Sequence, residues 1–221
     1  MTRRAYHKEL KALEDEVCIL ADMAADAVDK SIRALKDRDI EASKEIVEND
    51  AVINKKRFEI ENRCLLLLAT QQPMAVDLRV IAAILSIITD LERIADHAEG
   101  NANISVMIGD APLVKPITHL PKMAEISLKM LSDCMDAYKA RDIESAKAVC
   151  DEDDKVDALY DDVYKELLMI MIDDQSTIKG ATYLMWAAHN MERVADRVTN
   201  IAERVVFMVT GKLEEMNVSK Y

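Results

Sequence analysis

The feature that most constrains the fold of this chain is an internal repeat with a period of about 100 residues. The segment KDRDIEASK at residues 36–44 recurs as KARDIESAK at residues 139–147. Further along, LERIAD at residues 91–96 recurs as MERVAD at residues 191–196. A duplicated chain builds its core from two similar units. We therefore expect two homologous halves.

The composition indicates that both halves are helical. Half of the 221 residues are hydrophobic but only 4% are aromatic, and the chain has only four glycines and four prolines. Sheets favour β-branched and aromatic residues joined by frequent turns. Three of the four prolines and Gly109 mark a linker at about residues 109–118. We therefore divide the chain into a first bundle, residues 1–110, and a second bundle, residues 111–221.

Each half contains three stretches with apolar residues at helical spacing. Asp39 and Asp142 are suitable N-caps for the middle stretch of each half, and Pro73 interrupts the first half after its middle stretch. The predicted helices cover residues 6–36, 39–70, 75–108, 118–140, 142–173 and 177–210. Short connections make sequential helices antiparallel. The predicted fold is therefore all-α, a tandem duplication of a three-helix up-down-up bundle with six long helices.

The net charge of −12 restricts the partners of the chain. Such an acidic surface is repelled by nucleic-acid backbones and anionic lipids, and the basic runs are too short to offset this. The chain opens without a secretory signal and contains no apolar run of about 18 residues, so we expect a cytoplasmic protein without membrane insertion. The four cysteines form no Cys-x-x-Cys pair and are expected to be small buried hydrophobes.

The duplicated Glu-Arg-x-Ala-Asp motif places two carboxylates four residues apart on one helix face, as Glu92 with Asp96 and as Glu192 with Asp196. Like charges at this spacing destabilise a helix by roughly a few tenths of a kcal/mol, and a shared cation would reverse the sign. In a chain with 41 acidic residues one such pair arises easily by chance. The duplication favours a site, as does the apolar stripe that turns acidic from Glu92 to Glu99.

The middle helix of each half offers acidic residues that could face this motif. Asp153 and Asp157 lie in the second half, and Asp50 with Asn54 in the first. Asp50 precedes the break near residue 71 by about as many residues as Glu92 follows it, so antiparallel helices bring them to similar heights. Hard oxygen ligands of this kind suit Mg, Mn, Ca or Fe. A cation site is therefore favoured over the alternative, a solvated acidic face.

Enzyme chemistry is disfavoured by what surrounds the histidines. Ferritin-like di-iron enzymes need Glu-x-x-His on two helices, but none of the four histidines has a Glu three residues before it. His189 lies three residues before Glu192 and could reach the same patch. The chain also has no Gly-rich phosphate loop, no Gly-x-Ser-x-Gly elbow and no His-Glu-x-x-His motif.

These residues resemble the PhoU family, which comprises phosphate-transport accessory and regulatory proteins. DLERIADHA at residues 90–98 and NMERVADRVTNI at residues 190–201 are similar to the two signatures of the family. QQPMAVDLR at residues 71–79 is similar to its connection into the third helix. The resemblance covers about residues 6–211. It implies a pair of similar three-helix bundles, in agreement with the helical periodicity.

The resemblance also implies metal binding and partners. Family clusters of the form Glu/Asp-x-x-x-Asp bind iron, zinc, manganese or magnesium, and they correspond here to Asp50, Glu92, Asp96, Asp153, Asp157, Glu192 and Asp196. The implied partners are the ATPase subunit of a phosphate ABC transporter and a phosphate-sensing histidine kinase, with a homodimer as the assembly and no enzymatic activity. Asn54 stands where the family has an acid, so we expect a weaker first site. The alternatives are a structural bundle without metal and a di-metal carboxylate enzyme.

Overall fold

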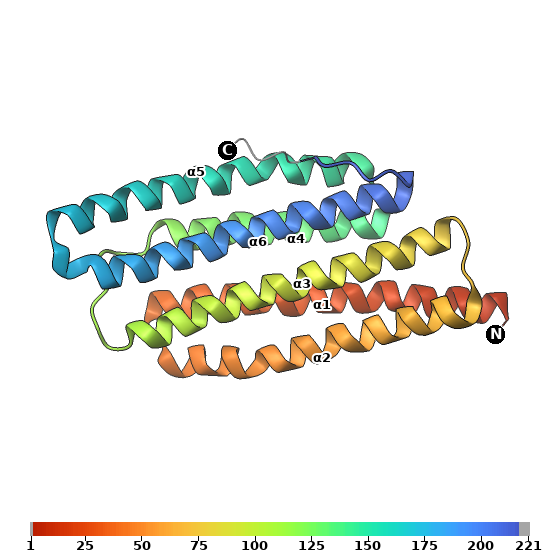
Figure 1. Cartoon of the computed structure of the whole chain (residues 1–221), viewed down its shortest axis with the longest axis horizontal. Helices are drawn as coiled ribbons and strands as arrows, with labels where there is room; N and C mark the ends of the chain where they lie inside the picture. Colours follow the sequence, from red (N-terminus) through yellow and green to blue (C-terminus); the bar gives the residue numbers. More distant parts are fainter. Residues whose placement is uncertain (1, 217–221) are drawn as a thin grey trace.

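The structure contains six long α-helices that run along one axis (Figure 1). A computed structural model describes residues 2–216. The helices in this range are α1 (Arg3–Asp37), α2 (Ile40–Gln71), α3 (Val76–Ile108), α4 (His119–Ala140), α5 (Ile143–Asp173) and α6 (Ile178–Thr210), with one 3-10 turn, η1 (Gln175–Thr177), before α6. The predicted all-α fold is confirmed, and each predicted helix end lies within three residues of the observed one.

The repeated segment Arg-Asp-Ile-Glu forms the same helix-to-helix corner in both halves. Arg38 and Arg141 follow α1 and α4 in the left-handed backbone region, each with a φ of 59°, and this reverses the chain direction. The next residue caps the following helix. Asp39 accepts one backbone N–H hydrogen bond of 2.9 Å, and Asp142 accepts two, of 3.0 and 3.2 Å. The repeat is therefore a helix stop followed directly by a helix start.

The two halves pack side by side and share one hydrophobic core. In Figure 1, α2 and α5 form the two outer edges, α3 and α6 lie in front, and α1 and α4 lie behind. Contacts between the halves are made by α3 with α6 and by α1 with α4. One continuous cluster of buried apolar side chains includes residues of all six helices. Within residues 2–216, no helix combines the length and the apolar character needed to cross a bilayer.

The contact between α3 and α6, called here the α3–α6 seam, relates equivalent residues of the two repeats. Arg197 on α6 lies 3.4 Å from Asp90 on α3, measured from Nη1 to Oδ1. Toward the other end of the seam, the Asn190 amide donates a 3.0 Å hydrogen bond to Asn101. Because Asp90 and Asn190 are equivalent in the repeat, the two contacts mark an antiparallel crossing near a pseudo-twofold axis.

The segment between α3 and α4 coincides with the predicted linker and follows a close path. Gly109 ends α3 with a φ of 59°, and Arg38 donates a hydrogen bond to the Asp110 carbonyl. Gly180 on α6 lets the linker approach, since a Cβ there would lie 2.7 Å from the Val114 Cγ1 atom. The linker is therefore fastened to both halves.

We predict that Asp142→Ala lowers the free energy of unfolding by about 1 kcal/mol, because α5 loses the cap that accepts two backbone N–H groups. Urea unfolding followed by circular dichroism measures this change. Asp151→Ala is the matched control, since Asp151 is an exposed acid further along α5. Equal effects of the two substitutions would show that the charge of Asp142, rather than its capping bonds, matters.

Candidate functional site

The acidic residues predicted to face one another lie on antiparallel helix pairs. The first cluster is defined by Asp50 and Asn54 on α2 with Glu92, Asp96 and Glu99 on α3. The second cluster is defined by Asp153 and Asp157 on α5 with Glu192 and Asp196 on α6. Because the connections between these helices are short, residues at equal distances from each connection come opposite one another.

The first cluster brings three carboxylates together. One oxygen each of Asp50, Asp96 and Glu99 lies within 4.8 Å of the others, and all three residues are half-buried. The Asn54 amide donates a 2.6 Å hydrogen bond to Asp50 Oδ2. The other oxygens of these two side chains, Asp50 Oδ1 and Asn54 Oδ1, are buried and accept no hydrogen bond within residues 2–216. Hard cations are bound by oxygen ligands, and buried oxygens without hydrogen bonds beside carboxylates are suitable ligands.

Burial and mutual repulsion disfavour simultaneous ionisation of the three close carboxyl groups in the first cluster. Burial raises the pKa of the Asp50 carboxyl from 3.8 to about 6, and the neighbouring carboxylates add to the shift in the order Glu99, Asp96 and Glu92. Like charges close together favour the protonated form of one of them. A bound cation would replace that proton and stabilise all of the carboxylates as anions.

The second cluster shows the same repulsion with a different distribution of charge. Burial raises the pKa of Glu192 from 4.5 to about 7, and Asp196 and Asp157 contribute further while Arg193 opposes them. Burial followed by Asp196 also raises the pKa of Asp157. Asp153, one turn before Asp157 on α5, is only 1% exposed. Four acids of this half therefore line the boundary between α5 and α6.

An arginine within each repeated motif partly neutralises the acids from the solvent side. Arg93 Nη1 lies 2.8 Å from Asp96 Oδ2, and Arg193 Nη1 lies 2.9 Å from Asp196 Oδ2. Each arginine also lies 3.3 to 3.5 Å from the preceding glutamate of its motif. The duplicated Glu-Arg-x-Ala-Asp motif therefore forms the same small set of ion pairs in both halves.

The carboxylate oxygens that lie closest together in the first half are a slightly different set from the predicted ligands. Asp50 and Asp96 meet as predicted, but the third close oxygen belongs to Glu99, while Glu92 acts on Asp50 through its charge. Glu99 lies on the acidic stripe of α3 and is not among the predicted ligands; the second repeat has Thr199 at this position. Glu99 can be identified from its position along α3, which lies opposite Asp50 on α2, but not from the repeat.

The predicted residues of the second half lie at one helix boundary but less closely. Within residues 2–216, the only group of three ligand atoms within 4.8 Å of one another is in the first cluster. His189 does reach the second cluster, with its Nδ1 atom 3.4 Å from Glu192 Oε2. The structure therefore places His189 beside the carboxylates of the second cluster.

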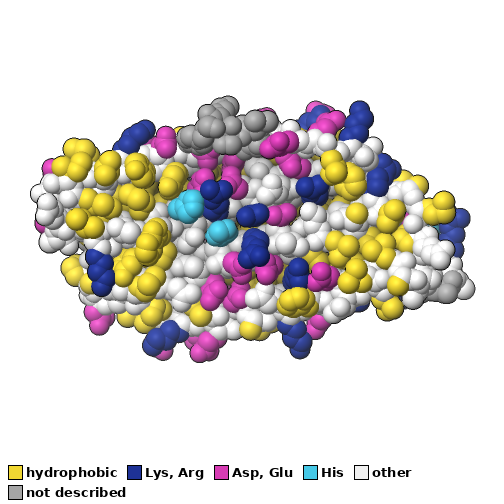
Figure 2. Space-filling view, in the orientation of Figure 1, with side chains coloured by type: hydrophobic (Ala, Val, Ile, Leu, Met, Phe, Trp, Pro, Cys, Tyr) yellow, Lys and Arg dark blue, Asp and Glu magenta, His cyan; other side chains and the backbone are white. Residues whose placement is uncertain are grey.

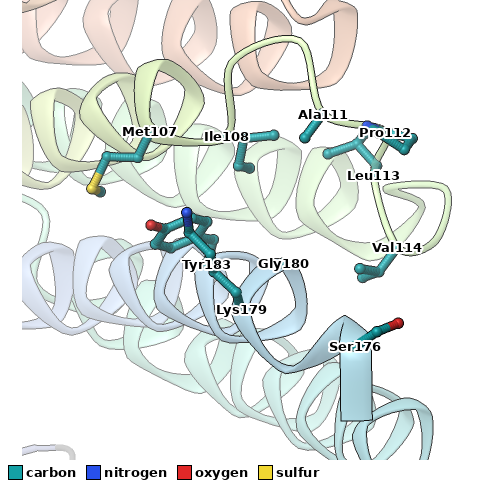
Figure 3. A pocket seen from close by; sticks show the side chains of 10 residues that line it. All are labelled: Met107, Ile108, Ala111, Pro112, Leu113, Val114, Ser176, Lys179, Gly180 and Tyr183. Carbon is teal, nitrogen blue, oxygen red and sulfur yellow. The ribbon is translucent and has the colours of Figure 1, made fainter. Parts of the chain in front are cut away.

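A hollow beside the linker has different chemistry from the clusters (Figure 3). It measures about 220 Å³ and lies between α6 and the chain that leaves α3. Its lining is mainly apolar, with Lys179 and Ser176 as polar exceptions and without any carboxylate. Lys179 precedes Glu192 by 13 residues, which is about 20 Å along a helix. The hollow is therefore separate from the acidic clusters.

Comparison with known proteins matches the whole architecture. The family description "PhoU domain" matches residues 17–104 and again residues 120–205. The chain is 34% identical to a "Phosphate-specific transport system accessory protein PhoU homolog" of Clostridium acetobutylicum over 218 residues, which cover 98% of this chain and 100% of that protein. A homologue of the same name from Aquifex aeolicus is 34% identical, with 93% of each chain covered.

Two solved structures match the fold. The PhoU regulatory protein of the phosphate transport system from Streptococcus pneumoniae superimposes with a TM-score of 0.88 at 31% identity, covering 95% of this chain and 99% of that one. PhoU from Pseudomonas aeruginosa also gives a TM-score of 0.88, at 29% identity and with 94% and 100% coverage. With two family domains and relatives matched over almost its full length, this chain belongs to the PhoU family.

Proposed function

We propose that this chain is an accessory and regulatory protein of a phosphate transport system. It acts in the cytoplasm on the ATPase subunit of a phosphate ABC transporter, and it restrains a phosphate-sensing histidine kinase. It regulates these partners without catalysing a reaction itself. The names and coverage of its relatives support the regulatory role. The kinase and the ATPase subunit are the partners implied by the family resemblance.

The proposal includes metal ions at the acidic clusters, and one observation carries it. Three oxygens of the first cluster, from Asp50, Asp96 and Glu99, lie within 4.8 Å of one another beside two buried oxygens that accept no hydrogen bond in the described chain. Hard oxygen donors of this kind suit iron, manganese or magnesium, and zinc also accepts carboxylates. Asn54 contributes its amide oxygen where the second cluster has the Asp157 carboxylate.

The second cluster would hold a cation through Asp153, Asp157, Glu192 and Asp196, with His189 at its edge. A bound cation supplies positive charge among carboxylates that otherwise repel one another. The residues themselves join α2 to α3 and α5 to α6, so their neutralisation strengthens both helix pairs. The acidic side chains gather on both sides of the middle of the face shown in Figure 2.

The same face offers apolar surface for a protein partner. Figure 2 shows hydrophobic side chains gathered toward both ends of the face. The large apolar residues exposed on the helices lie mainly on α2, α3, α5 and α6, with Leu66 62%, Ile172 64% and Trp186 51% exposed. Exposed apolar patches of this kind mark interaction sites. They support docking to the transport machinery or to a second copy of the chain in the homodimer.

The first prediction from this proposal concerns Asp50→Asn. It should weaken the binding of Mn²⁺ or Fe²⁺ at the first cluster at least about tenfold, since even partners outside the ligand shell contribute 10- to 100-fold. Elemental analysis of purified protein and calorimetric titration measure this. Glu48→Gln is the control, because Glu48 is an exposed acid on the same helix. Wild-type protein that binds none of the four metals would favour the structural bundle.

The second prediction concerns pH in metal-free protein. Glu192 keeps its proton up to about pH 7 in the folded chain, whereas the unfolded chain loses it near 4.5. Between these values the unfolded state binds fewer protons, so the contribution of Glu192 to stability decreases as pH rises. Melting temperatures in chelator from pH 4.5 to 8 should show a smaller decrease for Glu192→Gln than for wild type. Glu125→Gln, at an exposed site on α4, should follow wild type.

The third prediction tests the partner. Trp186→Ser removes an exposed aromatic side chain from the apolar surface of α6, so it should weaken co-purification with the transporter ATPase subunit while the helical content stays constant. Lys129→Ser, on the exposed side of α4, should leave co-purification unchanged. Retention of the partner at wild-type levels by Trp186→Ser would place the docking surface elsewhere.

A further inference from the structure

A strip of nitrogen-bearing side chains, two arginines and a histidine, runs along the α3–α6 seam between the two acidic clusters. Arg197 and Arg204 lie seven residues apart on the same side of α6, and both act electrostatically on Asp90 of α3. His97 of α3 lies close enough to Arg197 for the charge of the arginine to lower the histidine pKa, after the larger effect of burial. Figure 2 shows Lys, Arg and His side chains together in the middle of this face, with acids on both sides.

The strip contains nitrogen atoms without hydrogen-bond acceptors. Arg197 Nε and Arg204 Nε are buried and donate no hydrogen bond within residues 2–216, and His97 Nε2 is buried without a partner there. Farther along α3, the same is true of Arg79 Nε. An unsatisfied buried donor lowers the stability of the fold, and a charged donor lowers it more. The strip therefore has hydrogen-bond donors without acceptors, whereas the first cluster has oxygen acceptors without donors.

The charge of the strip is incompletely balanced. Arg204 makes no ion pair with any residue of the described range, although the chain contains 41 acidic residues. Arg197 has one acidic partner, Asp90, at 3.4 Å, which is a long contact. Within residues 2–216, Asp90 is therefore the one carboxylate that forms an ion pair with either arginine. The Arg197 side chain is 36% exposed, so a solute can reach its outer edge.

We propose that the α3–α6 seam binds a phosphate-type oxyanion through Arg197 and Arg204. A planar guanidinium offers paired N–H donors that match the oxygens of a phosphoryl group. Asn200 lies between the two arginines in the sequence of α6, and its side chain forms a hydrogen bond with Asp90, the carboxylate with which the oxyanion would compete. The nitrogen donors of the chain itself would bind the oxyanion, so the site requires no metal ion. The choice of phosphate rests on the proposed function, because both place the chain in phosphate regulation.

The position of this site gives it a direct structural consequence. Asp90 belongs to the first half and the two arginines belong to the second. An oxyanion that takes over the hydrogen bonds of Arg197 would compete with the only carboxylate that links the halves at this point. A bound oxyanion would therefore alter the contact between α3 and α6, and this contact lies between the two acidic clusters.

Calorimetric titration of the full chain with inorganic phosphate, in chelator and at low ionic strength, tests the proposal. Wild type should bind saturably, and Arg197→Gln and Arg204→Gln should each weaken binding at least about tenfold. Arg204→Lys keeps the charge but loses the planar fork, so its affinity should lie between wild type and Arg204→Gln. Arg33→Gln, at an exposed arginine of α1, should bind as wild type does. Circular dichroism verifies folding.

A second arm identifies the source of the oxyanion. Vesicles of phosphatidylcholine with and without phosphatidylglycerol replace free phosphate in a sedimentation assay. Binding only to the anionic vesicles, with loss in both arginine variants, would assign the seam to a lipid headgroup. No binding of either probe, or equal binding by an Arg197→Gln/Arg204→Gln double variant, would overturn the proposal. Phosphate binding that requires added metal and survives in the double variant would also overturn it, while leaving the metal clusters intact.

Discussion

Repulsion between half-buried carboxylates is the interaction on which the chemistry of this protein depends. The helices hold these acids in place because the opposite side of the same turns is fully buried. On α3, Leu91, Ile94 and Ala95 are at most 1% exposed and alternate with the acids of the motif. Burial of a leucine or isoleucine side chain contributes about 1.5–3 kcal/mol, which exceeds the roughly few tenths of a kcal/mol lost by one exposed acidic pair. The core therefore fixes the acids at a boundary where a cation is favourable.

The helical architecture could be predicted from the sequence because it depends on local and periodic features. Aspartate caps, a proline break and apolar spacing determine where each helix begins and ends, and the matched distances of Asp50 and Glu92 from the break indicated their antiparallel facing. The shared core was not predictable in this way. It depends on how α3 packs against α6, two helices that are far apart in the sequence, and local patterns do not specify such a contact.

The proximity of the carboxylates in the first cluster was predicted only in part, for a related physical reason. Residues three and four positions apart share a helix face, so Glu92 and Glu99 both flank Asp96. Which of them approaches α2 depends on the angle at which the helices cross and on side-chain rotamers. The structure brings the Glu99 oxygen close to Asp50 and leaves Glu92 as a more distant charge. The duplication in the sequence identifies the motif, whereas Glu99 is present in the first copy alone and is not marked by the repeat.

The two copies have diverged at the positions that surround their acids, and the divergence separates their properties. In the first cluster, Asn54 donates a hydrogen bond to Asp50, whose carboxylate lies close to those of Asp96 and Glu99. In the second, an aspartate replaces that amide, His189 joins the edge, and Glu203, farther along α6, accepts a hydrogen bond from the Met216 backbone N–H. Each cluster contains four carboxylates, but only in the first do three carboxylate oxygens lie within 4.8 Å of one another, and a compact arrangement of ligands gains from preorganisation. The fold thus provides two acidic clusters of unequal geometry on either side of the α3–α6 seam.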